Sequence, residues 1–342
     1  MTSEAGAEEV RRFDEGGPSL SEVGEAVLLQ RVREAAFPAA QGLAVPPGDD
    51  AAVWIPPPGV GLALSQDALV EGVDFRRAWI APRRLGRRSV EVALSDLAGM
   101  GATPAWCSVT LCAPRSTQLE DCLEIERGIV EGARAAACAV AGGDVSDTAG
   151  PLVIDVAVGG TLREGACLRR DAGRVGDLLL VTGELGGAAA GLAGLEGEAA
   201  GDAWVRRLLD PRARIAEGRR LAEAGVRCGG DISDGLVAEA ARTAAASRCG
   251  AELWLDGVPA APGLSDAFPV RWAELALAGG EDFELLAAAA PAVVDRVRLA
   301  WPVGLAPLHI VGRLIAGEGV RLLSAQGGRS IEVPQPRSRH WR

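Results

Sequence analysis

Apolar and polar positions recur along the chain in two different periods. Apolar residues spaced three and four apart predict helices, which are expected at residues 21–36, 83–98, 119–139, 204–209, 213–223 and 236–246. Short apolar runs beside Gly, Pro or Asp predict strands, which are expected at residues 51–55, 61–65, 106–111, 152–158 and 177–181 and at the end of 275–286. These elements mix without strict β-α-β alternation, so the pattern indicates an α/β (or α+β) fold.

The chain is long enough for two domains. It has 342 residues, whereas single domains usually have about 100–200, and the strand at 152–158 is expected to close the first domain. We therefore expect a flexible N-terminal tail at 1–20, a first domain at 21–160, a second domain at 161–335 and a C-terminal tail at 336–342.

Charge and hydropathy argue against two kinds of partner. The formal net charge is −11 and the pI is near 4.9, which disfavours binding to nucleic acid. The longest uncharged apolar run, residues 285–294, is shorter than the roughly 20 residues that cross a bilayer. The N-terminus is acidic without an apolar signal segment, and the seven cysteines form no CxxC pair. These features predict a protein of the reducing cytoplasm that does not bind membranes.

Missing residue types exclude several catalytic mechanisms. The chain contains no Lys, Tyr or Asn, and its two histidines, His309 and His340, both lie near the C-terminus. A P-loop and a Schiff-base enzyme need Lys, and a protein-kinase site needs Lys and Asn. Ser-His-Asp catalysis has no GxSxG motif to support it. Aspartate is the catalytic residue type that remains abundant.

Aspartates next to Gly, Ser or the end of a predicted strand suggest a metal site. Two carboxylates about 4 Å apart repel each other by roughly 4 kcal/mol at an effective dielectric constant of 20. If several converge, they need a cation, and oxygen ligands without His or Cys select Mg²⁺. For any single aspartate, a turn or a helix cap is the favoured explanation, but seven such aspartates spread over both halves of the chain weaken it. The candidates are Asp49, Asp50, Asp67, Asp96, Asp144, Asp231 and Asp234.

Three glycine-rich segments offer a second signal. Backbone N–H groups at residues 142–144, 183–187 and 279–280 are able to approach phosphate closely, because glycine carries no side chain. Such turns are common, so each segment alone is a weak indication.

The order and wording of the motifs resemble the thiamine-monophosphate kinase family, which is related to aminoimidazole ribotide synthetase and selenophosphate synthetase. The resemblance covers residues 22–316. It rests on GDDAAV (48–53), SQDALVEGVDF (65–75), SDLAGMGATPAW (95–106), GGDVSD (142–147), LRRDAGRVGDLLLVTG (168–183), DISDGL (231–236) and AGGEDFELL (278–286). It implies a two-domain aminoimidazole ribotide synthetase-like fold, in which the N-terminal sheets of two subunits form a barrel across a homodimer.

The resemblance also implies roles for individual residues. The substrates are ATP and thiamine monophosphate, and several Mg²⁺ ions neutralise the phosphates during direct in-line transfer. Asp67, Asp234 and Arg170 match catalytic positions. The nucleotide contacts map to Gly143, Asp144, Arg170 and Ser233, and a substrate contact maps to Glu281. The metal ligands map to Asp50, Ser65, Asp67, Asp96, Asp144, Asp231 and Asp234.

Three departures from the family pattern concern the substrate and metal positions. Asp74 stands where the family has a substrate-contacting His, and Gln66 replaces a Thr but keeps an oxygen for a metal. The family's aromatic-x-His-Phe ending is present only as residues 338–341, so Trp341 is the expected substrate-covering aromatic residue.

Two alternatives stay open at this point. One is another ATP-using enzyme of the superfamily, although the chain lacks the N-terminal Cys and Lys of a selenophosphate synthetase and the C-terminal Cys of a hydrogenase-maturation protein. The other is a non-catalytic regulatory protein that binds Mg-nucleotide.

Overall fold

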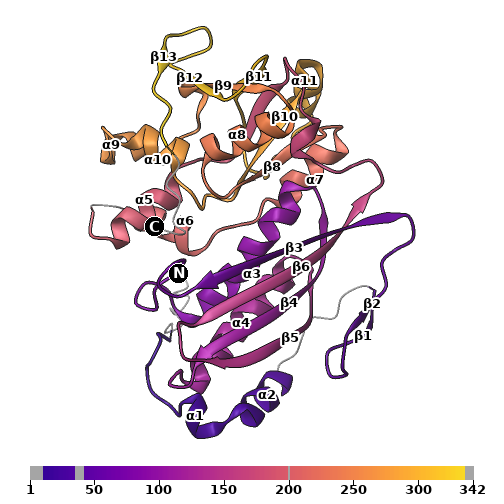
Figure 1. Ribbon diagram of the computed structural model, residues 1–342, viewed down its shortest axis with the longest axis vertical. Helices are drawn as coiled ribbons and strands as arrows, with labels where there is room; N and C mark the ends of the chain where they lie inside the picture. Colours follow the sequence, from indigo (N-terminus) through magenta and orange to yellow (C-terminus); the bar gives the residue numbers. More distant parts are fainter. Residues whose placement is uncertain (1–10, 35–41, 199–200, 336–342) are drawn as a thin grey trace, which may run out of the picture. The chain divides into compact units, whose positions relative to one another are not determined.

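The computed structural model describes residues 11–34, 42–198 and 201–335 (Figure 1). The chain divides into two compact units, which are considered separately. Unit 1 comprises Met1–Ile55, Gln66–Val90 and Trp106–Ala157, and unit 2 comprises Pro56–Ser65, Glu91–Ala105 and Val158–Arg342. Because both units are built from several chain segments, residues distant in sequence meet within each of them.

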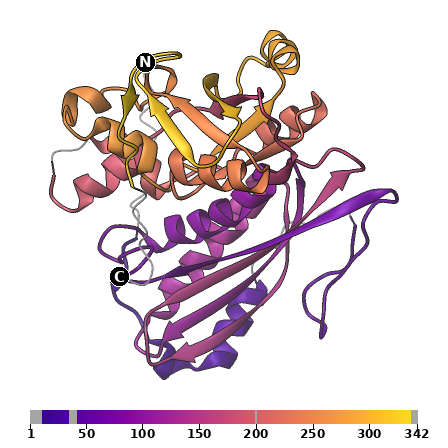
Figure 2. The ribbon, with the colours of Figure 1, turned by 45° about the horizontal axis from the view of Figure 1, so that its top comes forward.

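A four-stranded sheet contains most of the strands before residue 164. Its order is β3-β6-β4-β5, and β4 and β5 are parallel, with Trp106 opposite Ala139 and Pro114 opposite Thr148. Figure 2 shows helices α3 and α4 against one face of this sheet. The elements are β3 (Val60–Val70), α3 (Pro82–Gly99), β4 (Thr103–Pro114), α4 (Leu119–Ala135), β5 (Ala139–Thr148) and β6 (Val153–Arg163).

Four short elements precede this sheet in unit 1. Helices α1 (Leu20–Val23) and α2 (Glu25–Glu34) are followed by strands β1 (Leu43–Val45) and β2 (Val53–Trp54). The two strands pair antiparallel as a small separate sheet.

A seven-stranded sheet forms the centre of unit 2. Its order is β13-β12-β9-β11-β7-β10-β8. Among the printed pairs, β12 and β9 are parallel and the others are antiparallel. The strands are β7 (Leu178–Thr182), β8 (Cys228–Ile232), β9 (Gly250–Trp254), β10 (Glu284–Ala289), β11 (Leu308–Ile315), β12 (Val320–Leu323) and β13 (Ser330–Ile331).

Helices cover both faces of the seven-stranded sheet. Side chains alternate along a strand, so Leu179 and Val181 of β7 pack into one core with α5, α8 and α10, whereas Leu180 packs into the other with α7 and α11. The helical elements of unit 2 are η1 (Arg170–Ala172), α5 (Gly187–Leu195), α6 (Asp202–Leu209), α7 (Ile215–Glu223), α8 (Leu236–Ala246), η2 (Leu255–Gly257), α9 (Leu264–Ala267), α10 (Trp272–Ala278) and α11 (Pro291–Leu299).

Three expectations from the apolar pattern need correction. The helix expected at 21–36 is broken at Gly24, which has a φ of 76°, and its last two residues lie outside the described part of the chain. The helix expected at 119–139 ends at Ala135, and residues 142–144 lie within β5. Strand β3 runs to Val70, so Gln66 and Asp67 lie inside a strand instead of following one. By contrast, the helix predicted at 236–246 is confirmed as α8.

Within the described ranges, no helix is both long enough and apolar enough to span a bilayer.

Candidate active site

Pairing of β8 with β10 brings the DISD and GGED motifs together in unit 2. Asp231 lies opposite Leu285 in the antiparallel register. The N–H of Glu281 donates to the carbonyl of Ser233 at 2.7 Å, and the N–H of Phe283 donates to that of Ile232 at 3.1 Å. Glu281 has a φ of 69°, a left-handed conformation that costs a non-glycine residue energy. The two motifs therefore form one continuous loop surface held by backbone hydrogen bonds.

The SDLA motif at the end of α3 joins this surface. Ser95 Oγ donates to Asp231 Oδ2 at 2.9 Å, and Ser65 Oγ of β3 donates to Asp96. Asp231 is 4% exposed. Burial raises the pKa of Asp231 to about 6, and the negative charge of Asp96 acts in the same direction. Three of the predicted metal ligands thus lie in one acidic group.

Two arginines neutralise part of this negative charge. Arg170 Nη2 lies 3.6 Å from Asp231 Oδ1, and its Nε donates to Glu239 Oε1 at 2.6 Å. Arg242 Nη1 donates to Asp234 Oδ2 at 2.7 Å, and both of these side chains are exposed to solvent. Asp234 is therefore engaged by an arginine of α8.

The predicted site residues of unit 1 lie mainly on two strands of the four-stranded sheet. Asp67 and Gln66 belong to β3, and Gly143 and Asp144 belong to β5. A Cβ atom on Gly143 would lie only 2.2 Å from the carbonyl oxygen of Val109, so close packing of β5 against β4 already requires glycine there.

Gln66 has an acidic partner that the sequence did not single out. Its Nε2 donates to Asp155 Oδ2 on β6, which leaves Oε1 as the atom for its predicted metal-binding role. Asp155 lies in an apolar strand pattern, V-I-D-V-A-V, and that interruption is the signal that would have identified it.

Asp49 and Asp50 differ in the turn before β2. The carboxylate of Asp49 accepts the N–H of Asp50 at 2.9 Å, as expected for a turn-forming aspartate. Asp50 is exposed. Asp49 therefore stabilises the turn, in agreement with the family resemblance, which did not name it as a metal ligand.

Among the predicted substrate positions, Asp74 also has a local role. Its Oδ2 accepts the N–H of Val70 at 2.8 Å, which fixes the turn after β3. Trp341 lies outside the described residues.

The glycine-rich segment 183–187 is already occupied by a side chain of the protein. The N–H groups of Gly186 and Ala188 donate to Asp282 Oδ2 and Oδ1 at 2.6 and 3.0 Å. Burial raises the pKa of Asp282 to about 7, against the lowering effect of these two hydrogen bonds. The expectation that this segment would bind phosphate is therefore wrong for the N–H of Gly186, because a carboxylate already accepts it at the start of α5.

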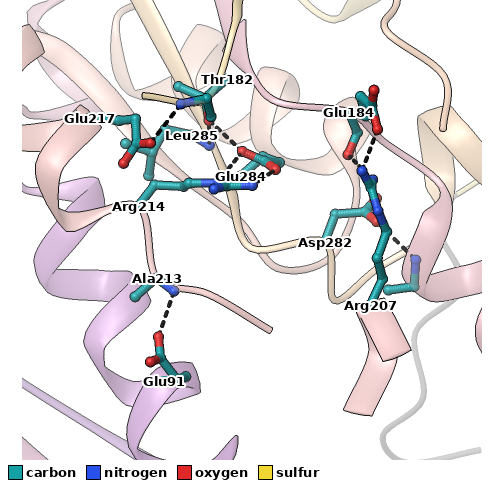
Figure 3. Close-up of polar contacts among 12 residues, drawn as sticks. Glu91, Thr182, Glu184, Arg207, Ala213, Arg214, Glu217, Asp282, Glu284 and Leu285 are labelled. Atoms are coloured by element: carbon teal, nitrogen blue, oxygen red, sulfur yellow. Dashed lines mark hydrogen bonds and ion pairs between the residues drawn. The ribbon is translucent and has the colours of Figure 1, made fainter. Parts of the chain in front are cut away.

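A buried ion pair supports the strand that follows the GGED motif. Arg214 Nε donates to Glu284 Oε2 at 2.7 Å, and Thr182 Oγ1 donates to the same oxygen at 2.7 Å (Figure 3). Thr182 Oγ1 in turn accepts the N–H of Leu285 at 2.8 Å. This network fixes the start of β10, and hence the position of the turn that carries Glu281.

The donor set of unit 2 fits magnesium. In the part of the chain that the structure describes, no group of three or more His, Cys, Asp or Glu side chains is arranged to hold a metal ion. Mg²⁺ usually takes only one or two carboxylates and completes its shell with water and substrate phosphates. Asp96 and Asp231, with the hydroxyl of Ser65, offer oxygen atoms alone. Burial is the main cause of the raised pKa of Asp231, and the charge of Asp96 adds to it; a cation would offset both effects.

The sequence did not indicate the residues whose side chains position the predicted site residues or the GGED turn. Arg214, Glu239 and Arg242 lie outside the motifs, and Ser95 lies in the SDLA motif without a predicted role. Their partners are up to 136 residues away. One signal was available: Glu239 falls on the face of α8 that carries Leu236, Ala240 and Thr243, all of them buried. A carboxylate on a buried helix face needs a cationic partner.

Known proteins resemble this chain over most of its length. Residues 48–162 match the family AIR synthase related protein, N-terminal domain, and residues 174–324 match AIR synthase related protein, C-terminal domain. The chain is 35% identical to the thiamine-monophosphate kinase of Rhodopirellula baltica over 292 residues, which are 81% of this chain and 85% of the relative.

Solved structures give the same picture. The thiamine-monophosphate kinase of Stenotrophomonas maltophilia superposes with a TM-score of 0.76 at 31% identity, covering 87% of this chain and 94% of that one. AaThiL complexed with AMPPCP and TMP gives a TM-score of 0.71 at 29% identity, covering 92% and 96%. The predicted aminoimidazole ribotide synthetase-like α/β fold is confirmed.

Proposed function

Because the chain belongs to the thiamine-monophosphate kinase family, we propose that it transfers the γ-phosphoryl group of ATP to the phosphate of thiamine monophosphate. The products are thiamine diphosphate and ADP. The observation that carries this proposal is the acidic group of unit 2, in which Ser95 bonds Asp231 and the charge of Asp96 acts on it. Its place beside Arg170 suits the binding of phosphates together with a cation.

Mg²⁺ is the proposed metal. Several ions, when bound, would neutralise the phosphates and stabilise the charge that moves to the leaving oxygen. The proposed ligands in unit 2 are Ser65, Asp96, Asp231 and Asp234, and those in unit 1 are Asp50, Gln66, Asp67 and Asp144.

Nucleotide and substrate are assigned to separate sets of residues. Gly143, Asp144, Arg170 and Ser233 are proposed to contact ATP. The guanidinium of Arg170 is permanently charged and presents a planar fork to phosphate, and its link to Asp231 places it beside the metal ligands. The proposed contacts to thiamine monophosphate are Asp74, Glu281 and Trp341.

The residues present favour direct transfer without a covalent intermediate. In-line phosphoryl transfer depends on positioning and charge neutralisation more than on a nucleophilic side chain. Asp231 and Arg170 hold fixed positions through hydrogen bonds to the buried side chains of Ser95 and Glu239, so little reorganisation is needed when the reactants bind. Asp67 and Asp234 are proposed as catalytic through the ions that they hold.

The oligomeric state and location are also proposals. A homodimer is supported by exposed apolar side chains on one face of β3, where Leu62 and Leu64 are 54% and 70% exposed, since such residues favour burial in an interface. Sedimentation of the wild type and of L62E/L64E would test this, with a dimer expected only for the wild type. The domain limits 21–160 and 161–335 and the cytoplasmic location stay predictions from the sequence.

A coupled ADP-release assay tests the proposed activity. Turnover is expected only when ATP, Mg²⁺ and thiamine monophosphate are all present. ATP binding without turnover would contradict it and would favour a regulatory nucleotide-binding protein.

A further inference from the structure

Glu239 lies at the centre of a chain of alternating charges in unit 2. It belongs to the first turn of α8, and its side chain is 0% exposed. Arg170 approaches it with two nitrogens, Nε at 2.6 Å from Oε1 and Nη2 at 3.2 Å from Oε2. Arg242 Nε donates to the same Oε2 at 2.9 Å. One buried carboxylate thus fixes two guanidinium groups.

Each of these arginines also reaches an aspartate of the DISD motif. Arg170 Nη2 lies 3.6 Å from Asp231 Oδ1, and Arg242 Nη1 lies 2.7 Å from Asp234 Oδ2. Charges of opposite sign therefore alternate along the series Asp231, Arg170, Glu239, Arg242, Asp234. A change at Glu239 acts on both aspartates through their arginines.

Gly230 leaves space for the side chain of Glu239. A Cβ atom on Gly230 would lie 2.2 Å from Glu239 Oε1 and 3.0 Å from Arg170 Nε. Any larger residue at position 230 would displace the carboxylate, the guanidinium or both. Glycine directly before Asp231 is therefore explained by the space that this ion pair needs.

Burial makes the pairing rigid. The side chains of Arg170 and Arg242 are 40% and 41% exposed, and a long arginine side chain in that position would otherwise sample many rotamers. Water cannot reach the fully buried carboxylate of Glu239 to take over the hydrogen bonds of the two arginines, so these hydrogen bonds are strong and restrict both arginine side chains.

We infer that Glu239 is a positioning residue for nucleotide binding: it orients Arg170 toward the ATP phosphates and holds Arg242 against Asp234. This inference rests on the proposed function, in which Arg170 contacts ATP. The side chain of Glu239 itself does not touch the reactants.

Replacement of Glu239 by Gln keeps the volume and removes the charge. The amide also places a donor where Arg170 and Arg242 present donors, so the two-point contact with Arg170 is lost. Loss of an outer-shell partner at a metal site typically costs about 10- to 100-fold in affinity, and we expect a loss of the same order for the partner of a phosphate-binding arginine. E239Q is therefore expected to raise the KM for ATP by that factor and to leave the KM for thiamine monophosphate nearly unchanged.

Calorimetric binding of AMPPCP gives a readout that does not depend on turnover. E239Q is expected to lose affinity for AMPPCP by the same factor, and E239D, which keeps the charge, is expected to recover part of it. E252Q is the matched control, because Glu252 is also buried but its side chain bonds Arg313 Nη2 at 3.0 Å and Trp254 Nε1 at 3.1 Å, residues that lie outside the motifs. Its nucleotide affinity should equal that of the wild type.

A double variant separates positioning from a general structural effect. If Glu239 acts through Arg170, E239Q/R170A binds AMPPCP no more weakly than R170A alone. Additive losses, or an unchanged ratio of the two KM values in E239Q, would overturn the inference. Should E239Q fail to fold, E239D must still show selective loss of nucleotide affinity, and wild-type affinity in E239D would equally overturn it. Failure of the wild type to release ADP would instead refute the proposed function.

Discussion

Arg214 and Glu284 form a two-point ion pair in unit 2, with Arg214 Nε 2.7 Å from Glu284 Oε2. The side chain of Glu284 is 3% exposed and that of Arg214 is 25% exposed. The pair joins the segment before α7 to the start of β10, directly after the turn that carries Glu281. The stability of this turn is therefore expected to depend on the guanidinium charge of Arg214, which has no proposed contact with ATP or thiamine monophosphate.

Removal of Arg214 should destabilise the protein strongly. R214M leaves the carboxylate of Glu284 buried without its cation, and breaking such a pair costs about 3–5 kcal/mol. Urea unfolding monitored by circular dichroism measures this loss. R271M serves as control, because Arg271 pairs with Glu198 near the surface and such pairs contribute about 0–1 kcal/mol. Equal effects of the two variants would contradict the importance of burial.

Loss of the Ser95 hydroxyl should affect the metal requirement. S95A removes the hydrogen bond to Asp231, which costs about 1–3 kcal/mol for a buried acceptor, and frees the carboxylate to move. The Mg²⁺ concentration for half-maximal turnover should rise by about tenfold. S89A is the control on the same helix, because Ser89 Oγ donates only to the carbonyl of Gly86; an equal rise there would count against a specific role for Ser95.

Substitution of Asp67 or Asp234, the proposed catalytic aspartates, should stop turnover and preserve the fold. D67N and D234N keep the side-chain volume but remove a charge that the proposed ions require. Neither side chain is buried, so unfolding free energies should change by less than about 1 kcal/mol. D147N is the control, because it alters an exposed aspartate of β5 that has no proposed role, and it should retain activity. Wild-type kinetics in D67N or D234N would refute their assignment as ligands.

Glu126 should make unit 1 less stable as pH rises. Burial raises the pKa of Glu126 to about 7, although Arg127 partly opposes this, and its Oε1 has no hydrogen-bond partner among the described residues. Between pH 4.5 and 7 the folded state binds more protons than the unfolded state, so this group's contribution to stability falls as pH rises. E126Q should therefore be more stable than the wild type at pH 8 and show no such advantage at pH 5.

Denaturant unfolding of both proteins at pH 5, 6, 7 and 8 checks this prediction. The difference between wild type and E126Q cancels the contribution of the other titrating groups. A difference that stays constant with pH would mean that Glu126 does not titrate in this range.

The apolar pattern located elements whose ends are marked by local signals. Helix α8 follows Gly235 and was predicted with its observed limits. The helix predicted at 119–139 is longer than the observed α4, because Gly142 and Gly143 look like helix terminators in the sequence but lie inside β5. What ends the helix is a turn before β5, with Ala137 at a φ of 53°. A conformation of this kind in alanine leaves no trace in the sequence.

The site was predictable only where the chemistry resides in a motif. Asp96, Asp231 and Asp234 were predicted as candidate metal ligands because they lie in the SDLA and DISD motifs. The partners of Arg170 were not predicted. Its carboxylate partner, Glu239, lies 69 residues away and is brought there by the packing of α8 beside η1. Likewise, nothing local in segment 183–187 indicates that Asp282 accepts the N–H of Gly186 and that of Ala188, the residue after the segment.

Transfer of a labelled phosphoryl group tests the central claim most directly. With [γ-³²P]ATP, Mg²⁺ and thiamine monophosphate, the label should appear in the terminal phosphate of thiamine diphosphate, with one ADP formed for each labelled product. Release of the label as inorganic phosphate, with no labelled thiamine compound, would contradict the proposed reaction.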